Sequence, residues 1–489
     1  IQSVTLVDMS ASFFFYDLET SGLSAFNARI MQFAGRRTDL NLNPIGEPFN
    51  ILIRMTEDIL PDPDAVLVTG ITPQTVMAEG ITEAEFLRVF SDEIATPGTI
   101  FTGYNSVRFD DEFVRLLHYR NFYDPYEWQW QDSRSRWDIL DVVRMTRALR
   151  PDGIQWPFDV HDKPTNRLEL ITALNKLEHE HAHDALSDVD ATIAVARLIR
   201  NKQTKLFEYL LGMRDKRKVA ELVEGREPFV YTSGTYPSEF DKTTVVATIC
   251  PHPRNQGNSF VFDLRHDPLE YKDMTPEQLA ERWRWKKDAE EPRLPVKTVQ
   301  YNKCPAVAPL GVLDAASQKR IQIDMAVVQK NLKALKTMKD LEERLCKAWE
   351  ILESGREQTM LVNTEQDADT GIYQGFFDNQ DKQSMRVVRA AKPEELSDLG
   401  LNFRDQRLVA LLPLYKARNY PKTLTSEERV EWERFCRQRL LGGGHQSKMA
   451  KFYARLQELA AREGITSHQK YLLEELSLYA ESIMPDPEA

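Results

Sequence analysis

The sequence has 489 residues, of which 42% are hydrophobic and 28% charged, and its net charge is −12 with a pI near 5.4. This length exceeds one ordinary core, so two to four domains are expected, and the composition is typical of a soluble globular protein. No run of eighteen apolar residues is present, which excludes a transmembrane helix, and the acidic balance argues mildly against a nucleic-acid partner.

The four cysteines lie far apart and form no Cys-x-x-Cys pair. Their spacing argues against a zinc ribbon and against a disulfide scaffold. Residues 1–10 also lack the basic start and the long apolar core of a signal peptide. We therefore expect a protein of the reducing cytoplasm with no membrane partner.

The first 200 residues alternate between predicted strands and predicted helices. Residues 12–19, 48–55 and 98–105 are rich in apolar and aromatic residues and predict strands. Residues 110–123 and 187–203 have apolar residues at helical spacing. This alternation predicts an α/β domain.

The pattern changes after about residue 202. Residues 242–268 predict two strands joined by a loop rich in Pro, Asn and Gly, and residues 295–309 predict another strand. We expect a smaller β-containing domain that ends near residue 355.

The last 130 residues are predicted to be mostly helical. Residues 426–441, 447–464 and 467–484 are long amphipathic segments, and Ser426 and Ser467 are expected to cap the N-termini of two of these helices.

Two acids stand at the end of the first predicted strand. Asp17 and Glu19 directly follow the apolar run 13–15. Side chains on a strand alternate between faces, so both carboxylates are expected to point the same way. Two carboxylates on one face of a buried strand suggest a metal site.

Two further acidic clusters follow. Asp110 and Asp111 stand at a predicted helix start, where acids also favour the helix dipole with no functional role. His183 and Asp188 stand at the start of the helix predicted over 187–203. A histidine-rich metal box made of His179, His181 and His183, or a solvated helix start made of Asp184, Asp188 and Asp190, are alternatives for this region.

Joined in order, the three clusters resemble the DEDD superfamily of 3′→5′ exonucleases, which have a ribonuclease H-like fold. The matching positions are Asp17, Glu19, Asp110, His183 and Asp188, and residues 67–74 also look like a segment of this superfamily. The histidine places the chain in the DEDDh branch, since the other branch has Tyr where this chain has Asp184.

The resemblance implies hydrolysis of phosphodiesters with two Mg²⁺ ions roughly 3.5–4 Å apart, for which Mn²⁺ can substitute. Asp17 is expected to bridge the ions, with Glu19, Asp110 and Asp188 as further ligands. His183 is expected to be the general base, because an imidazole pKa near 6.5 suits that task at neutral pH. The expected products are 5′-mononucleotides.

Longer segments narrow the resemblance to the bacterial exodeoxyribonuclease I family. Residues 103–142, 148–157, 260–270, 296–305 and 372–385 carry it, and it covers nearly the whole chain. It implies an exonuclease domain at 1–201, an SH3-like domain at 202–355 and an all-α domain at 356–489, which together form a C-shaped clamp. It also implies processive digestion of single-stranded DNA in repair and recombination by a monomer.

Aromatic residues mixed with Arg suit a reader of single strands, because bases stack on aromatic rings and a basic groove holds the backbone. The residues expected to contact DNA are Glu19, Arg115, Tyr126, Trp130, Arg144, Arg167, Lys297, Asn302 and Tyr373. Tyr126 and Trp130 are candidates for stacking, although core positions are the alternative for each aromatic.

Several basic segments make local positive potential plausible on a chain whose net charge is negative. They are residues 202–218, residues 282–287, and Lys330, Lys333, Lys336 and Lys339, each of which is more simply a solvated helix face. The resemblance also implies binding to the acidic C-terminal tail of single-stranded DNA-binding protein. Its pocket is not located by the sequence.

Other functions remain open at this point. The same chemistry could act on short RNA, since only the 2′-hydroxyl distinguishes the substrates. An inactive DNA-binding scaffold is another class, and the five filled catalytic positions argue against it. A histidine-rich zinc hydrolase would keep its activity without Asp17 and Glu19.

Overall fold

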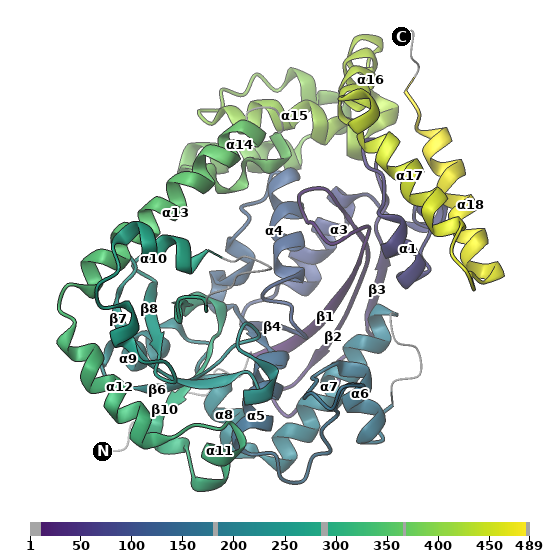
Figure 1. Ribbon diagram of the computed structural model, residues 1–489. Helices are drawn as coiled ribbons and strands as arrows, with labels where there is room; N and C mark the ends of the chain where they lie inside the picture. Colours follow the sequence, from purple (N-terminus) through teal and green to yellow (C-terminus); the bar gives the residue numbers. More distant parts are fainter. Residues whose placement is uncertain (1–10, 179–183, 285–291, 365–367, 486–489) are drawn as a thin grey trace, which may run out of the picture.

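The computed structural model describes residues 11–178, 184–284, 292–364 and 368–485. It contains two five-stranded sheets followed by a run of helices. Figure 1 shows the second sheet, the long helix α13 and the C-terminal helices following an arc around the first sheet. The mixed α/β, β-containing and all-helical regions predicted from the sequence are therefore present in that order.

The first sheet has the strand order β3-β2-β1-β4-β5. Its central strand β1 is antiparallel to β2 and parallel to β4, β2 is antiparallel to β3, and β4 is parallel to β5. The strands are β1 (Ser12–Thr20), β2 (Ile30–Thr38), β3 (Phe49–Leu52), β4 (Thr99–Gly103) and β5 (Ser135–Asp138). The three predicted strands are confirmed as β1, β3 and β4, and β2 and β5 were not predicted.

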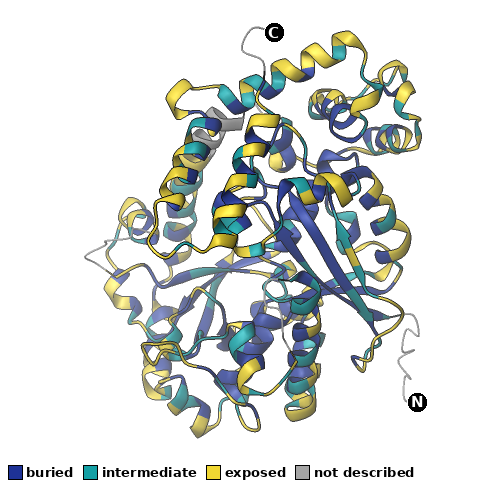
Figure 2. Ribbon diagram, turned by 90° about the vertical axis from the view of Figure 1, so that its right-hand side faces the viewer, coloured by how far each residue is buried: buried dark blue, intermediate teal, exposed yellow. Residues whose placement is uncertain are grey.

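Strand β1 is buried on both faces, which explains its unbroken apolar run. Phe13 and Phe15 join a core with helices α5 and α7 that continues into the second sheet, whereas Phe14 and Tyr16 join a core with α3, α4 and the C-terminal helices. Figure 2 shows these central strands buried, with the exposed residues on the outer sides of the helices.

Seven α-helices surround the first sheet in the described part of residues 11–202. They are α1 (Pro63–Thr69), α2 (Pro73–Glu79), α3 (Glu83–Val89), α4 (Asp110–Arg120), α5 (Ile139–Leu149), α6 (Leu168–Leu174) and α7 (Ala185–Lys202). Helix α7 packs on β1 and β2. Helices α4 and α7 lie where the sequence predicts helices.

The second sheet is antiparallel throughout, with the order β10-β6-β7-β8-β9. Its strands are β6 (Phe229–Thr232), β7 (Thr243–Pro251), β8 (Asn258–Asp263), β9 (Val296–Gln300) and β10 (Ala306–Pro309). The helices around it are α8 (Thr204–Gly212), α9 (Lys216–Glu224), α10 (Pro276–Trp283), α11 (Ala315–Arg320), α12 (Met325–Thr337) and α13 (Leu341–Thr364). Residues 295–309 thus form two strands, where the sequence predicts one.

The C-terminal region is helical. Its α-helices are α14 (Asn379–Ala390), α15 (Gln406–Asn419), α16 (Ser426–Leu441), α17 (Lys448–Ala460) and α18 (Ser467–Ser482). The predicted N-caps at Ser426 and Ser467 are wrong by one residue, because Thr425 and Thr466 are the caps. Each Thr forms a capping box with the residue three positions on, and this reciprocal pair of hydrogen bonds places the cap before the Ser.

A buried ion network joins the C-terminal helices to the first sheet's domain. Asp369 accepts hydrogen bonds from Arg29 at 3.2 Å, from Arg418 at 2.7 Å and from Arg439 at 3.0 Å. Arg418 also donates to Asp58 at 2.8 Å. All five side chains are at least nine-tenths buried, so the two regions are held by charges that water does not screen.

The four cysteines are free thiols. Across the described residues, no helix combines the length and the apolar character that crossing a bilayer requires.

Candidate metal centre and nucleic-acid interface

Three carboxylates meet at the end of β1. Asp17 and Glu19 continue the face of β1 that packs against α7, and Asp188 comes from the first turn of that helix. One oxygen of each carboxylate lies within 4.8 Å of the others. The strand period of two, together with a helix docked on the same face, therefore brings together three of the four acids predicted as metal ligands, and Asp110 is not among the three.

Two contacts fix α7 in this position. The Asp184 side chain caps the helix by accepting from the Ser187 backbone N–H at 3.1 Å. Arg36 on β2 forms a two-point bond with Asp190 at 2.6 and 3.0 Å. Asp184 and Asp190 thus orient the helix, whereas Asp188 faces the other carboxylates.

The neighbouring acids Asp110 and Asp111 have different environments. Asp111 accepts a hydrogen bond from the Tyr16 hydroxyl at 2.6 Å and another from Arg136. Asp110 begins α4, and its charge interacts most strongly with that of Asp17. Asp111 is therefore structural, and Asp110 is the acid of this pair that faces the carboxylate cluster.

The approach of β4 to β1 positions Asp110. A Cβ at Gly103, the last residue of β4, would lie 2.9 Å from the Tyr16 carbonyl oxygen, so glycine permits this close contact. Sequence reasoning missed Asp138, which accepts from the backbone N–H groups of Asn105, Val107 and Leu140 and so holds the loop before α4. Its place directly before a helical run was the available signal.

Burial and mutual repulsion disfavour charge on this cluster. Burial, with the charge of Asp188, raises the pKa of Asp17 to about 8. Burial, with Asp17 next in importance, raises the pKa of Glu19 to about 9. Burial and Asp17 also raise the pKa of Asp110 well above its usual range. Carboxylates crowded in this way lose their protons to the solvent when a bound cation neutralises their charge.

The donor set fits hard divalent cations. It offers only carboxylate oxygens, which suit Mg²⁺ or Mn²⁺ better than soft ions. His183, predicted as the general base, lies outside the described residues.

Several predicted DNA contacts lie beside α4. Arg115 is buried and bonds Glu112 at 2.5 Å, and the Tyr373 hydroxyl donates to the same Glu112. Tyr126 is half-buried, and its ring packs edge-on against that of Phe376, which is 84% exposed. Residues from α4 and from the C-terminal region thus form one aromatic and charged surface.

The predicted DNA contact Lys297 lines a cavity of about 890 Å³ that lies mainly against the second sheet. Its lining includes Lys297 with four arginines and no acid: Arg108, Arg284, Arg293 and Arg356. Lys297 donates to Thr235 at 2.5 Å, and burial lowers the pKa of Lys297 to about 8. Arg108, which also lines the cavity, pairs with Asp141 at 2.9 Å.

Family models match three consecutive parts of the chain. They are an exonuclease model over residues 14–196, the exonuclease I SH3-like domain over 214–351 and the exonuclease I C-terminal domain over 366–483. Exodeoxyribonuclease I of Haemophilus influenzae is 39% identical over 474 residues, which cover 96% of this chain and 98% of that protein. The chain belongs to the exodeoxyribonuclease I family.

Solved structures agree with this assignment. Escherichia coli exonuclease I in complex with a dA16 oligonucleotide has a TM-score of 0.90 at 37% identity, over 97% of this chain and all of that one. A zinc-bound form of the E. coli enzyme with single-stranded DNA has a TM-score of 0.89, and a complex of SSB and exonuclease I with the inhibitor CFAM has 0.87, each at 36% identity and with 97% of this chain covered.

Other predicted contacts of this exonuclease I family chain are dispersed. Arg144 donates to Asp141 at 2.7 Å and packs on Gly234, and the Asn302 carbonyl accepts from Arg136. Trp130 is 61% exposed, and Arg167 is exposed and pairs with Glu169 at 2.6 Å. The structure does not bring Trp130 or Arg167 into contact with the carboxylate cluster.

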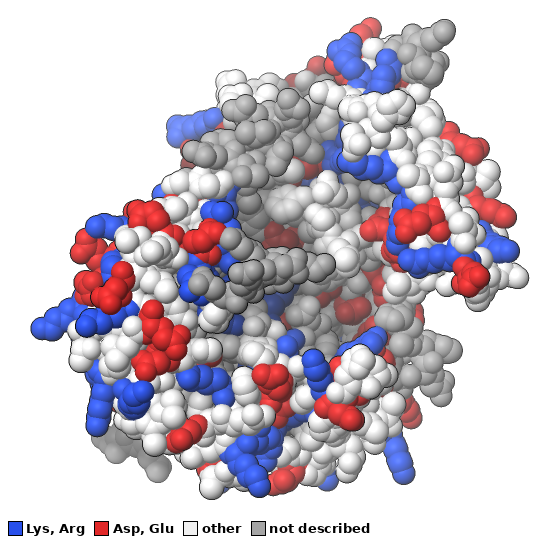
Figure 3. Space-filling model, viewed as in Figure 1, with Lys and Arg blue, Asp and Glu red and all other residues white. Residues whose placement is uncertain are grey.

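Surface charge is mixed on this family member. Figure 3 shows Lys and Arg interspersed with Asp and Glu across one face. Lys330, Lys333, Lys336 and Lys339 are all exposed, while the apolar side of α12 is buried. Lys330, Lys333 and Lys336 therefore form the solvated helix face that was the simpler interpretation, and Lys339 is exposed just after the helix ends.

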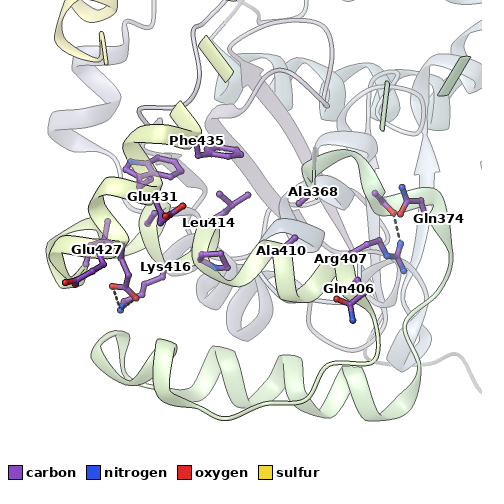
Figure 4. Close-up of a pocket in the computed structure, with 16 residues that line it drawn as sticks. Ala368, Gln374, Gln406, Arg407, Ala410, Leu414, Lys416, Glu427, Glu431 and Phe435 are labelled. Atoms are coloured by element: carbon purple, nitrogen blue, oxygen red, sulfur yellow. Dashed lines mark hydrogen bonds and ion pairs between the residues drawn. The ribbon is translucent and has the colours of Figure 1, made fainter. Parts of the chain in front are cut away.

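A separate cavity of about 720 Å³ lies among the C-terminal helices (Figure 4). Leu414, Trp432 and Phe435 line it, and Lys416 on its border is bonded to Glu428 at 2.8 Å. None of the predicted site residues lines this cavity, so it has no part in the site.

Proposed function

We propose that the protein degrades single-stranded DNA from its 3′ end to 5′-mononucleotides, as a processive exonuclease of DNA repair and recombination. The convergence of Asp17, Glu19 and Asp188 at the end of β1 carries the proposal. Family membership over almost the whole chain and the oligonucleotide complexes of the E. coli relative support DNA as the substrate.

We propose that Asp17, Glu19, Asp110 and Asp188 hold two Mg²⁺ ions, which Mn²⁺ can replace. When bound, the ions supply charge stabilisation to the attacking and leaving oxygens. The zinc-bound E. coli form supports a divalent cation in this family. His183 is proposed as the general base on the attacking water.

Aromatic and basic side chains of the protein are proposed to position the DNA strand. Tyr126, Trp130 and Tyr373 are proposed to stack on bases, and Arg115 and Arg144 to contact phosphates. Glu19, Arg167, Lys297 and Asn302 complete the proposed set. The basic cavity lined by Arg108 and Lys297 is proposed to carry the strand along the second sheet.

The chain is further proposed to act as a cytoplasmic monomer divided at 1–201, 202–355 and 356–489. The acidic tail of single-stranded DNA-binding protein is proposed as a partner, which the solved complex of SSB with exonuclease I supports.

Digestion of a 5′-labelled single-stranded DNA oligonucleotide with Mg²⁺ tests the function. Label that passes from the intact strand into the shortest fragments with few intermediate lengths, with duplex DNA and RNA of the same sequence spared, is expected. Equal digestion of RNA would favour the oligoribonuclease-like alternative, and no cleavage with Mg²⁺ or Mn²⁺ would favour an inactive scaffold.

A further inference from the structure

A small polar cavity lies where helix α14 meets the first sheet's domain. Its volume is about 210 Å³. Its walls come from η1 (Phe90–Ile94), the end of α4, residues 123–134 and α14. The ionisable residues that line it are His118, Tyr123, Asp124, Glu127, Arg134, Lys382, Arg386 and Arg389.

Cations outnumber anions in this lining. Three arginines and Lys382 face only two carboxylates, and Lys382 already bonds both, Asp124 at 2.7 Å and Glu127 at 3.0 Å. His118 adds no charge at neutral pH, because burial lowers its pKa to about 4. The three guanidinium groups therefore carry positive charge that the cavity's own acids do not balance.

The arginines are held mainly by neutral groups. Arg134 donates to the Ala95 carbonyl at 2.6 Å and approaches the exposed Asp132 at 3.5 Å. Arg389 donates to the Phe122 carbonyl and lies 4.0 Å from the centre of the Tyr123 ring. In the described part of the chain, exposed Arg386 has neither a hydrogen-bond partner nor an ion-pair partner.

The walls limit what can enter. Phe90, His118 and Trp128 are almost completely buried and pack on one another, and Arg389 covers Tyr123. No open aromatic face is left for a base among these residues. Space of this size with several guanidinium donors suits a compact tetrahedral anion, which arginine binds with paired N–H groups.

We infer that this cavity binds a phosphate-type oxyanion, with Arg386 and Arg389 as its principal ligands. The anion would join α14 to the segment 123–134, which also carries Tyr126 and Trp130. Its source is either a backbone phosphate of the DNA strand, which rests on the proposed function, or a free phosphate group such as that of inorganic phosphate or a 5′-mononucleotide.

A purely structural latch is the competing explanation. Lys382 alone would then fix α14 through Asp124 and Glu127. In that explanation Arg386 has no role, so substitution of Arg386 distinguishes a structural latch from an anion site.

The test is calorimetric titration of the full chain with sodium phosphate in EDTA, at ionic strength held constant with sodium chloride. EDTA prevents phosphate from binding through a metal, and no catalysis is required, so failure of the proposed function leaves this test intact. We expect one saturable site, roughly tenfold weaker in R386A. E127Q removes a competing carboxylate and should tighten binding several-fold.

K392A is the matched control, because it removes one exposed cation just past the end of α14, outside the cavity, and it should bind phosphate like the parent. Affinity for a dT oligonucleotide in EDTA assigns the source. Weaker DNA binding by R386A indicates a backbone phosphate, and unchanged DNA binding with weaker phosphate binding indicates a free one. Absence of saturable phosphate binding by the parent chain, or parent-like binding by R386A, would overturn the inference.

Discussion

At the scale of single residues, Asp110 and Asp111 show how two adjacent acids separate into different roles. The helix start alone leaves the dipole interpretation open for both acids, and only the family resemblance singles out Asp110. Asp111 is fixed by Tyr16, 95 positions earlier, and by Arg136, 25 positions later. Such partners are set by the sheet's topology, so no local pattern could have revealed them.

The different roles of Asp110 and Asp111 predict different effects for two substitutions. D110N should lower the rate of DNA cleavage more than about 100-fold, because it removes a proposed metal ligand, without loss of stability. D111A should lower the free energy of unfolding by about 3–5 kcal/mol, because it leaves the buried Arg136 without its carboxylate. Thermal melts and cleavage rates of both variants check this, and equal loss of stability in both would contradict the assignment.

The raised pKa values of Asp17 and Glu19 predict a pH dependence. Without metal the folded chain keeps protons that the unfolded chain loses, so stability should fall as pH rises from about 4 to about 9 and then level off. The Mg²⁺-induced rise in Tm should therefore be larger at pH 9 than at pH 6. Melts in EDTA and in Mg²⁺ measure this, with D17N as the control whose dependence is weaker. A Mg²⁺ effect larger at pH 6 would refute it.

At the scale of elements, α7 carries Asp188 to the cluster, and its cap Asp184 sets where the helix begins. Apolar periodicity was enough to predict α4 and α7, although α4 is buried on nearly every side. Sequence patterns did not predict β2, which ends in Arg36, Arg37 and Thr38, or β5, whose four residues Ser135–Asp138 include two charged side chains that are nonetheless buried. The caps at Thr425 and Thr466 were missed because Ser and Thr stand side by side and both can cap.

Removal of the α7 cap should affect the metal requirement. D184A should lower stability by about 1 kcal/mol and raise the Mg²⁺ concentration needed for half-maximal cleavage, because it frees the turn that carries Asp188. D184N keeps a capping oxygen and should recover most of both. D324A is the control, because it removes the cap of α12. It should lower stability as much as D184A does and leave the Mg²⁺ requirement unchanged. A higher Mg²⁺ requirement in D324A would contradict the account.

At the scale of the whole molecule, the first sheet is enclosed from two sides. One of its cores continues into the second sheet, and the other includes α14 and α15. The order of the three regions was predictable because each has its own periodicity. Their docking was not, since Asp369 meets Arg29 across 340 positions.

That docking predicts a strong effect far from the carboxylates. D369A should lower the free energy of unfolding by about 3–5 kcal/mol, since it leaves Arg29, Arg418 and Arg439 with less negative charge in a buried site. The loss should change little between low and high salt. Denaturant unfolding checks it beside D398A, an exposed acid of the same region, which should stay within about 0.5 kcal/mol of the parent. A loss that high salt erases would contradict burial of the network.

Release of the terminal nucleotide from a 3′-labelled single-stranded DNA tests the central claim most directly. With Mg²⁺ the label should leave in the first turnover as a 5′-mononucleotide, and with EDTA or in D17N it should stay on the strand. Release that persists in EDTA, or label that remains on the strand while the 5′ end is shortened, would contradict a carboxylate metal site acting on the 3′ end.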